Sequence, residues 1–197
     1  MKKIKLGTEV MVSDPCYTEG TWCQSKISNV IPGMYDIYVE KSDEGDWGER
    51  VKSITVLHER IKTPIWDEYS TVGVDSGQMG VFCMTSYRND TISNELPWLT
   101  DKGNPFGEHP YQPKDEGGEQ WYVKMCDRTL HEDQWGVYDT GVVTSSGYGD
   151  GSYLLEVCEI DGQKCGFQIT FISDWEDDDE EDFEEIEEEY EDSEYDY

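Results

Sequence analysis

Three turns rich in glycine or proline carry the polar residues of this sequence whose types and spacing could do chemistry. They are SDPCY at 13–17, GVDSGQMG at 73–80 and SSGYGDGSY at 145–153. Glycine lets a backbone approach a ligand closely and adopt positive φ, so such loops can hold a phosphate or a small polar molecule. The side chains that we expect to contact a ligand are Asp14, Tyr17, Asp75, Gln78, Ser146, Tyr148 and Asp150.

The carboxylates of these turns are Asp14, Asp75 and Asp150. If they converged at one sheet edge, they would suit a hard cation such as Mg²⁺ or Ca²⁺, or supply a general base beside Ser146 or Tyr148. However, Asp in a glycine-rich turn commonly accepts hydrogen bonds from its own backbone, and none of the three His lies in a turn. We therefore expect a non-catalytic protein without metal or cofactor. Asp75, Asp150 and Ser146 are the residues to test for catalysis.

The six cysteines do not have the spacing of a metal site, because no CxxC pair occurs. Cys158 and Cys165 flank an expected Asp161-Gly162 turn, which would place them directly opposite each other as a hydrogen-bonded pair. The Cα atoms of such a pair are widely separated, so we expect packed thiols rather than a disulfide. Cys16 has no positive charge nearby in the sequence, so we expect it to be buried rather than reactive.

The elements that must position these turns are mainly strands. Apolar and polar residues alternate in segments such as 8–13 and 34–40, and the Asp161-Gly162 pair predicts a hairpin. Only EQWYVKMCDRTLHE at 119–132 has its apolar residues at helical spacing. We therefore expect one mainly β domain over 1–173, a β-sandwich or a strongly twisted antiparallel sheet, with one amphipathic helix. The expected strands are 8–13, 34–40, 50–58, 71–74, 79–84, 141–146, 152–160 and 164–172.

Several segments also come in a distinctive order. The segment DPCY is followed by GVDSGQMG and then by SSGYGDGSY with its closing hairpin. Over about residues 9–172 this order resembles the bacterial and phage family called domain of unknown function 4241. The resemblance implies a bacterial or phage protein and assigns no activity. The C-terminal segment lies outside it.

That segment, residues 174–197, is an acidic tail. It reads DWEDDDEEDFEEIEEEYEDSEYDY and holds seventeen of the 45 acidic residues with no Lys or Arg. We expect it to be disordered, to repel nucleic acid and to attract a basic surface. Phe183, Ile186 and Tyr190 would share one face of a helix formed against a basic groove, and with Trp175 they are the expected partner-binding residues. The alternative is a tail that only solubilises the chain.

Three functions remain open from the sequence. The first is a phage-type accessory protein whose tail engages a basic, nucleic-acid-binding protein, as an inhibitor of a host factor or defence protein. The second is a nucleotide-binding protein or hydrolase using the turns around Asp75 and Asp150, with Arg50, Arg88 and Arg128 as candidates to neutralise phosphates. The third is a single-stranded-DNA-binding protein with a partner-recruiting tail.

The charge balance and the hydropathy pattern rank these functions. A formal net charge of −30 disfavours direct nucleic-acid binding, which needs a basic groove, and the first function is therefore the one that we expect. No stretch is apolar enough for a membrane span, and no apolar run follows the start MKKIKLGTEV. We expect a cytoplasmic protein, in the host cytoplasm if it is viral, with no membrane partner.

Overall fold

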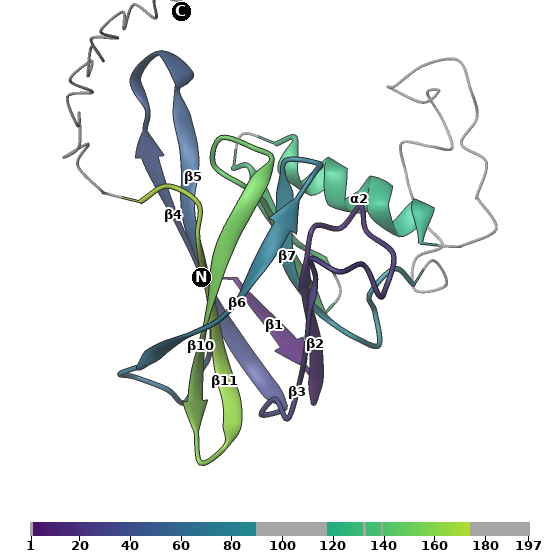
Figure 1. Ribbon diagram of the computed structural model, residues 1–197, viewed down its shortest axis with the longest axis vertical. Coiled ribbons are helices and arrows are strands. Elements are labelled where there is room, and N and C mark those ends of the chain that lie inside the picture. Colours follow the sequence, from purple (N-terminus) through teal and green to yellow (C-terminus); the bar gives the residue numbers. More distant parts are fainter. Residues whose placement is uncertain (1, 90–117, 132, 139, 174–197) are drawn as a thin grey trace, which may run out of the picture.

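Two antiparallel β-sheets pack against each other, and one helix lies on the outer face of the smaller sheet (Figure 1). The structure is a computed structural model that describes residues 2–89, 118–131, 133–138 and 140–173. The larger sheet has the order β1 (Lys3–Leu6), β4 (Gly33–Asp43), β5 (Glu49–His58), β11 (Gln163–Thr170), β10 (Gly151–Ile160) and β6 (Trp66–Val74). The smaller has the order β3 (Ser25–Ser28), β2 (Glu9–Ser13), β7 (Gln78–Cys83), β9 (Gly141–Ser145) and β8 (Trp135–Tyr138).

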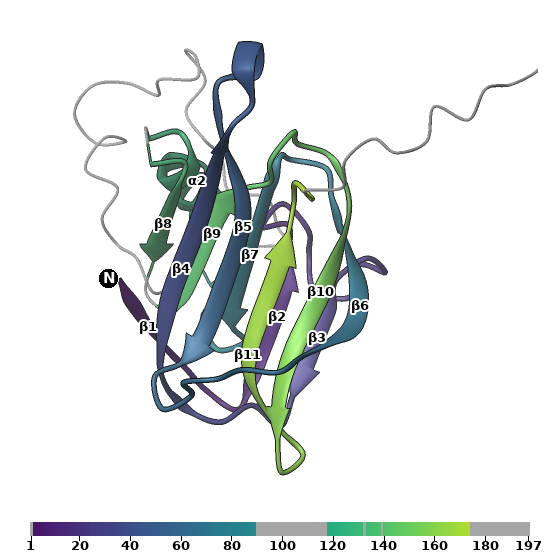
Figure 2. The same cartoon turned by 90° about the vertical axis from the view of Figure 1, so that its left-hand side faces the viewer.

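The main core lies between the two sheets, and Figure 2 looks onto the larger sheet with the smaller one behind it. Successive residues of a strand point to opposite faces, so Val10 and Val12 of β2 join this core while Met11 points to the other side. Strand β7 is buried along its whole length, because the larger sheet covers one of its faces and the helix covers the other.

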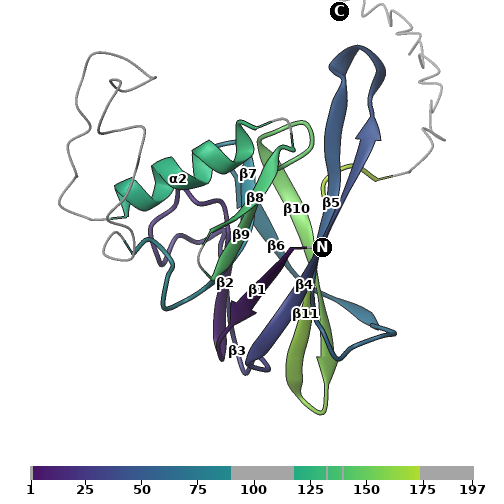
Figure 3. The same cartoon turned by 180° about the vertical axis from the view of Figure 1, so that it is seen from behind.

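The helix α2 (Glu119–Thr129) packs on β7 and β9 through a second, aromatic core (Figure 3). Trp121 is 2% exposed, and its ring lies edge-on to Phe82 and Tyr87 at centroid distances of 4.9 and 5.2 Å. Met125 lies one turn further along the same helix face and is fully buried. The helix predicted at 119–132 is confirmed, although it ends at Thr129.

The sequence predicted the general architecture. The mainly β fold with one helix is confirmed, and the two sheets form the sandwich rather than a single twisted sheet. All eight expected strands are present as β2, β4, β5, β6, β7, β9, β10 and β11. The sequence reading missed β1, β3 and β8, and also a short 3-10 helix, η1 (Gly45–Trp47). The tail at 174–197, with Trp175, Phe183, Ile186 and Tyr190, lies outside the described residues.

The hairpin between β10 and β11 turns at Asp161-Gly162, as predicted. Both residues have positive φ, at 52° and 77°, as the favoured two-residue hairpin turn requires. The prediction that Cys158 lies directly opposite Cys165 is wrong. A β-bulge pairs Cys158 with Gly166 instead, and Cys165 is the extra residue of the bulge. The two sulfur atoms nevertheless lie 3.4 Å apart, as free thiols.

We expect this thiol pair to resist alkylation in the native protein. Both side chains are buried, and burial together with the neighbouring Cys158 raises the pKa of Cys165 to about 12. At pH 8 the thiol is therefore protonated, whereas alkylation requires the thiolate. Mass spectrometry after iodoacetamide treatment should find Cys158 and Cys165 unmodified without denaturant and modified with it. A Cys158–Cys165 disulfide, or equal labelling in both conditions, would contradict the packed-thiol interpretation.

No helix among the described residues is long and apolar enough to cross a membrane.

Candidate functional site

The carboxylate of Asp14 ties the first turn to the second. Asp14 is fully buried, and its Oδ1 accepts hydrogen bonds from the Cys16 amide at 2.8 Å and from the Ser76 hydroxyl at 2.6 Å. Its Oδ2 accepts from the amides of Asp75 and Ser76 at 2.9 and 2.7 Å. A buried carboxylate is tolerated when several donors satisfy it, as four do here. Asp14 therefore holds two loops together, which is a structural role.

The third turn joins the second in a similar way. Asp150 Oδ1 accepts a hydrogen bond from the Gly77 amide at 3.1 Å, and the Ser146 amide donates to the Gly77 carbonyl at 3.1 Å. The amides of three successive residues, Asp75, Ser76 and Gly77, are thus bound by carboxylates from the two flanking turns. Gly77 has φ of 68°, which glycine adopts without strain. The three turns therefore meet in space.

Three of the expected ligand-binding side chains serve other contacts. The Ser146 hydroxyl is buried and donates to the Gly149 carbonyl inside its own turn, at 2.9 Å. The Gln78 side chain faces helix α2, where it donates to the Cys126 sulfur at 3.4 Å and accepts from the Thr129 hydroxyl at 3.2 Å. Neither side chain is among the described residues that line the pocket at the junction of the turns.

Tyr148 is the third expected ligand-binding residue with another contact, and its side chain is exposed. Its hydroxyl donates to Glu44, which raises the pKa of Tyr148, and its ring lies edge-on to Trp47. These partners belong to the β4–β5 connection. Tyr148 therefore packs against the β4–β5 hairpin and supports it.

The remaining expected residues line one open pocket. Tyr17, Asp75 and Asp150 stand around a hollow of about 420 Å³ at the junction of the turns. Sequence reasoning missed two further parts of the pocket lining, the start of β10 and the segment 21–23. A tryptophan in the polar segment TEGTWCQ was the signal that could have indicated it. The other lining residues are Thr21, Trp22, Cys23, Gly73, Val74, Gly151 and Ser152.

The electrostatics of this region do not favour a nucleophile or a general base. Burial, the Cys23 thiol and the Asp75 carboxylate raise the pKa of the Tyr17 hydroxyl, so it stays protonated near neutral pH. Burial and the Asp14 carboxylate raise the pKa of Cys16 to about 12, so its thiol is unreactive. The prediction that Cys16 is buried is only partly right, because its side chain is half-buried.

The geometry also does not favour a cation bound by the three carboxylates. Asp14 is occupied by four donors, and it lies inside the protein while Asp75 and Asp150 face the pocket. Within residues 2–89, 118–131, 133–138 and 140–173, no group of three or more His, Cys, Asp and Glu could hold a metal ion.

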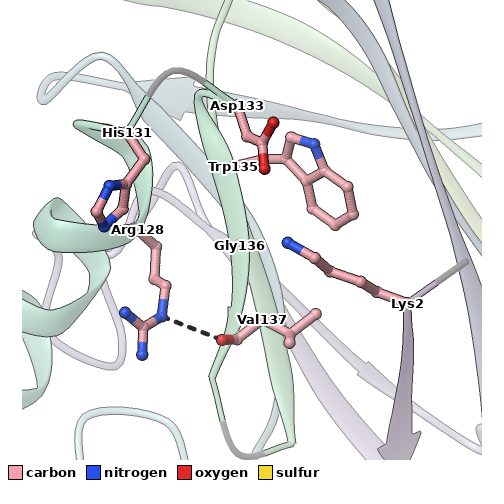
Figure 4. A pocket seen from close by; sticks show the side chains of 7 residues that line it. All are labelled: Lys2, Arg128, His131, Asp133, Trp135, Gly136 and Val137. Atoms are coloured by element: carbon pink, nitrogen blue, oxygen red, sulfur yellow. Dashed lines mark hydrogen bonds between the residues drawn. The ribbon is translucent and has the colours of Figure 1, made fainter.

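A second hollow lies between the start of β1 and β8, and basic side chains form part of its lining (Figure 4). The Lys2 ammonium lies 4.3 Å from the centroid of the Trp135 ring, and Arg128 donates to the Val137 carbonyl at 3.2 Å. Arg128 also forms an ion pair with Asp127 at 2.8 Å, so part of the positive charge is neutralised.

The arginines expected near the turns do not present a phosphate site there. Arg88 approaches the first turn, where it donates to the carbonyls of Pro15 and Cys16. Arg50 donates to the Trp47 carbonyl, and Arg128 belongs to the second hollow. Among the described residues, the pocket at the junction of the turns is lined by two carboxylates and by no Lys, Arg or His.

Fold and site together define a β-sandwich protein with an acidic, aromatic surface pocket. In comparisons with known proteins, no family model matches the chain, and no curated protein or solved structure matches it. The resemblance to domain of unknown function 4241 therefore stays a prediction.

Proposed function

We propose that this chain is a non-catalytic accessory protein that binds a basic protein, with the acidic tail as its main attraction. The partner that fits this chemistry best is a nucleic-acid-binding protein, whose basic surface the tail would occupy in place of a phosphate backbone. Inhibition of such a protein, for example a host factor or a defence protein, is the role that follows.

One observation carries the proposal: 45 acidic residues stand against 15 basic ones, and seventeen of the acids lie within residues 174–197, which hold no Lys or Arg. Charge of one sign accelerates encounter with an oppositely charged partner by about 10- to 1000-fold at low salt. The basic side chains of residues 1–173 offset little of this negative charge, since several already form ion pairs with acids. These pairs join Lys3, Lys26, Lys41, Arg128 and Lys164 to neighbouring carboxylates.

The two alternatives find less support. A nucleotide-binding site or hydrolase needs cations beside the phosphates and a free general base, whereas the described part of the chain lines the pocket at the three turns with two carboxylates and no cation. A single-stranded-DNA-binding protein needs a basic groove with stacking rings. The exposed rings Trp22 and Tyr69 each line a hollow together with acidic residues, and the Tyr148 hydroxyl donates to Glu44.

A titration with a defined basic probe tests the proposal. A fluorescent Arg- and Lys-rich peptide is titrated with the natural full chain and with a variant whose tail acids are replaced by Asn and Gln. We expect the variant to bind about 10- to 100-fold more weakly at low salt, with the difference shrinking at about 300 mM NaCl. Both chains should have the same circular dichroism and thermal unfolding. Equal affinity of the two chains for the peptide would overturn the role of the tail.

A further inference from the structure

We propose that the pocket bounded by Tyr17, Trp22, Asp75 and Asp150 receives a basic side chain of the partner protein, preferably arginine. The inference rests on the proposed function for the identity of the partner, and it adds to that function a specific contact on the folded body. Four features of the pocket support it in turn: an exposed tryptophan, a rigid loop, unbalanced charge and a neutral hydroxyl.

Trp22 is the first feature. It is 92% exposed and stands at the pocket wall, although tryptophan is normally among the well-buried side chains. No ring or cation of the described chain lies against it in a stacking or cation–π contact. The face of an indole is the best aromatic surface for a cation. An indole exposed beside two carboxylates therefore suits a cationic group and not an anion.

The loop that presents Trp22 is held in place, so its exposure does not come from a loosely attached segment. The amides of Gly20 and Thr21 both donate to Gln24 Oε1 at 3.0 Å. The Gln24 amide nitrogen in turn donates to the hydroxyls of Ser13 and Tyr87 at 2.9 and 2.7 Å. A preorganised wall loses little entropy when a ligand binds.

The base of this loop is fixed to the edge strand β6 as well. The Gly73 amide donates to the Cys23 carbonyl at 3.0 Å, and a Cβ added at Gly73 would lie only 2.9 Å from Cys23 Cβ. The glycine thus allows the 21–23 segment to approach β6 closely. Cys23 and Gly73 both line the pocket, so this close packing fixes the position of that part of its lining.

The charge of the pocket is negative and locally unopposed. Asp75 uses its backbone amide to bind Asp14, and its own carboxylate forms no ion pair with a described Lys, Arg or His. Within the described residues, Asp150 accepts the Gly77 amide through Oδ1 and its Oδ2 has no hydrogen bond, so Oδ2 can bind a ligand. Two carboxylates in a concave, partly apolar site focus a negative potential on its centre.

Tyr17 supplies a neutral polar group on the wall. Burial, together with the Cys23 thiol and the Asp75 carboxylate beside its hydroxyl, raises the pKa of Tyr17, so the hydroxyl stays protonated near neutral pH and adds a polar group without charge. Arginine fits this set better than lysine, because its planar guanidinium stacks on an aromatic ring while its five N–H groups bond carboxylates side by side. A volume of about 420 Å³ has room for such a side chain.

The test uses a matched pair of small probes. N-acetyl-arginine amide and the neutral N-acetyl-citrulline amide have nearly the same shape, and each is titrated into the ¹⁵N-labelled full chain. The readout is the indole N–H resonance of Trp22, assigned by its loss in Trp22→Phe. We expect the arginine probe, and not the citrulline probe, to shift this resonance with saturation. We expect Asp75→Asn to weaken that binding about fivefold, and Trp22→Ala to weaken binding of the basic peptide by a similar factor.

The outcomes separate this inference from the proposed function. An equal response to both probes, or no response at Trp22, overturns the pocket even if the tail still captures the basic peptide. A saturable arginine response that persists in the variant with a neutral tail supports the pocket independently of the tail. If Trp22→Ala and Asp75→Asn bind the basic peptide as tightly as the natural chain does, the pocket plays no part in partner binding.

Discussion

We expect Asp14→Ala to lower the free energy of unfolding by about 4 kcal/mol, measured by urea denaturation. The substitution removes the acceptor of four hydrogen bonds and leaves the amides of Cys16, Asp75 and Ser76 without their partner. Each buried donor left unsatisfied costs about 1 to 3 kcal/mol, and bonds to a charged acceptor are the stronger kind. The first two turns should then separate and the pocket beside them should lose its shape.

Two other substitutions in the same turns serve as controls. Ser76→Ala removes only one of the four hydrogen bonds and should cost about 1 kcal/mol. Asp75→Ala changes an exposed side chain and keeps the backbone amide, so its effect should stay within about 0.5 kcal/mol. If Asp14→Ala proves as mild as Asp75→Ala, the carboxylate does not hold the turns, and a functional role for Asp14 returns to consideration.

The second large effect is expected from Trp121→Ala, which should cost about 3 to 5 kcal/mol of unfolding free energy. Trp121 is 2% exposed and joins helix α2 to Phe82 and Tyr87. Its removal leaves a cavity that the paired strands beneath cannot close. Thermal unfolding followed by circular dichroism measures the loss.

Trp22→Ala is the matched control, because the same residue type is deleted at an exposed position. Its stability should change by no more than about 0.5 kcal/mol, since Trp22 is 92% exposed. A similar loss in both variants would mean that Trp22 packs against the body, which would also remove the reason to regard it as part of a binding site.

The strands and the helix could be predicted because their burial follows a period that the sequence displays. Met11 and Val12 illustrate the limit of that reasoning, since both are buried, one under the helix and one between the sheets. In a strand that is buried on both faces, apolar residues occupy successive positions, so the sequence no longer shows apolar and polar residues in alternation. Strands β1, β3 and β8 were missed, and each has only four residues, so pairing with longer neighbours stabilises them.

The candidate site could be predicted only in part. The turns were identified from their glycines, and Asp150 does accept a backbone hydrogen bond, although from Gly77 rather than from its own turn. Such pairings span many residues, so no local pattern reveals them. Trp22 was missed for the same reason. Its position at the pocket depends on the hydrogen bonds to Gln24 and on the close approach of Gly73, and no sequence motif indicates these contacts.

The most direct test of the central claim is capture from a nuclease-treated bacterial lysate by the immobilised full chain and by the variant with a neutral tail. Bound proteins are eluted with salt and identified by mass spectrometry. The account predicts that basic, nucleic-acid-binding proteins are enriched on the natural chain alone and released by salt. Enrichment of the same proteins by both chains, or of proteins without an excess of positive charge, would contradict it.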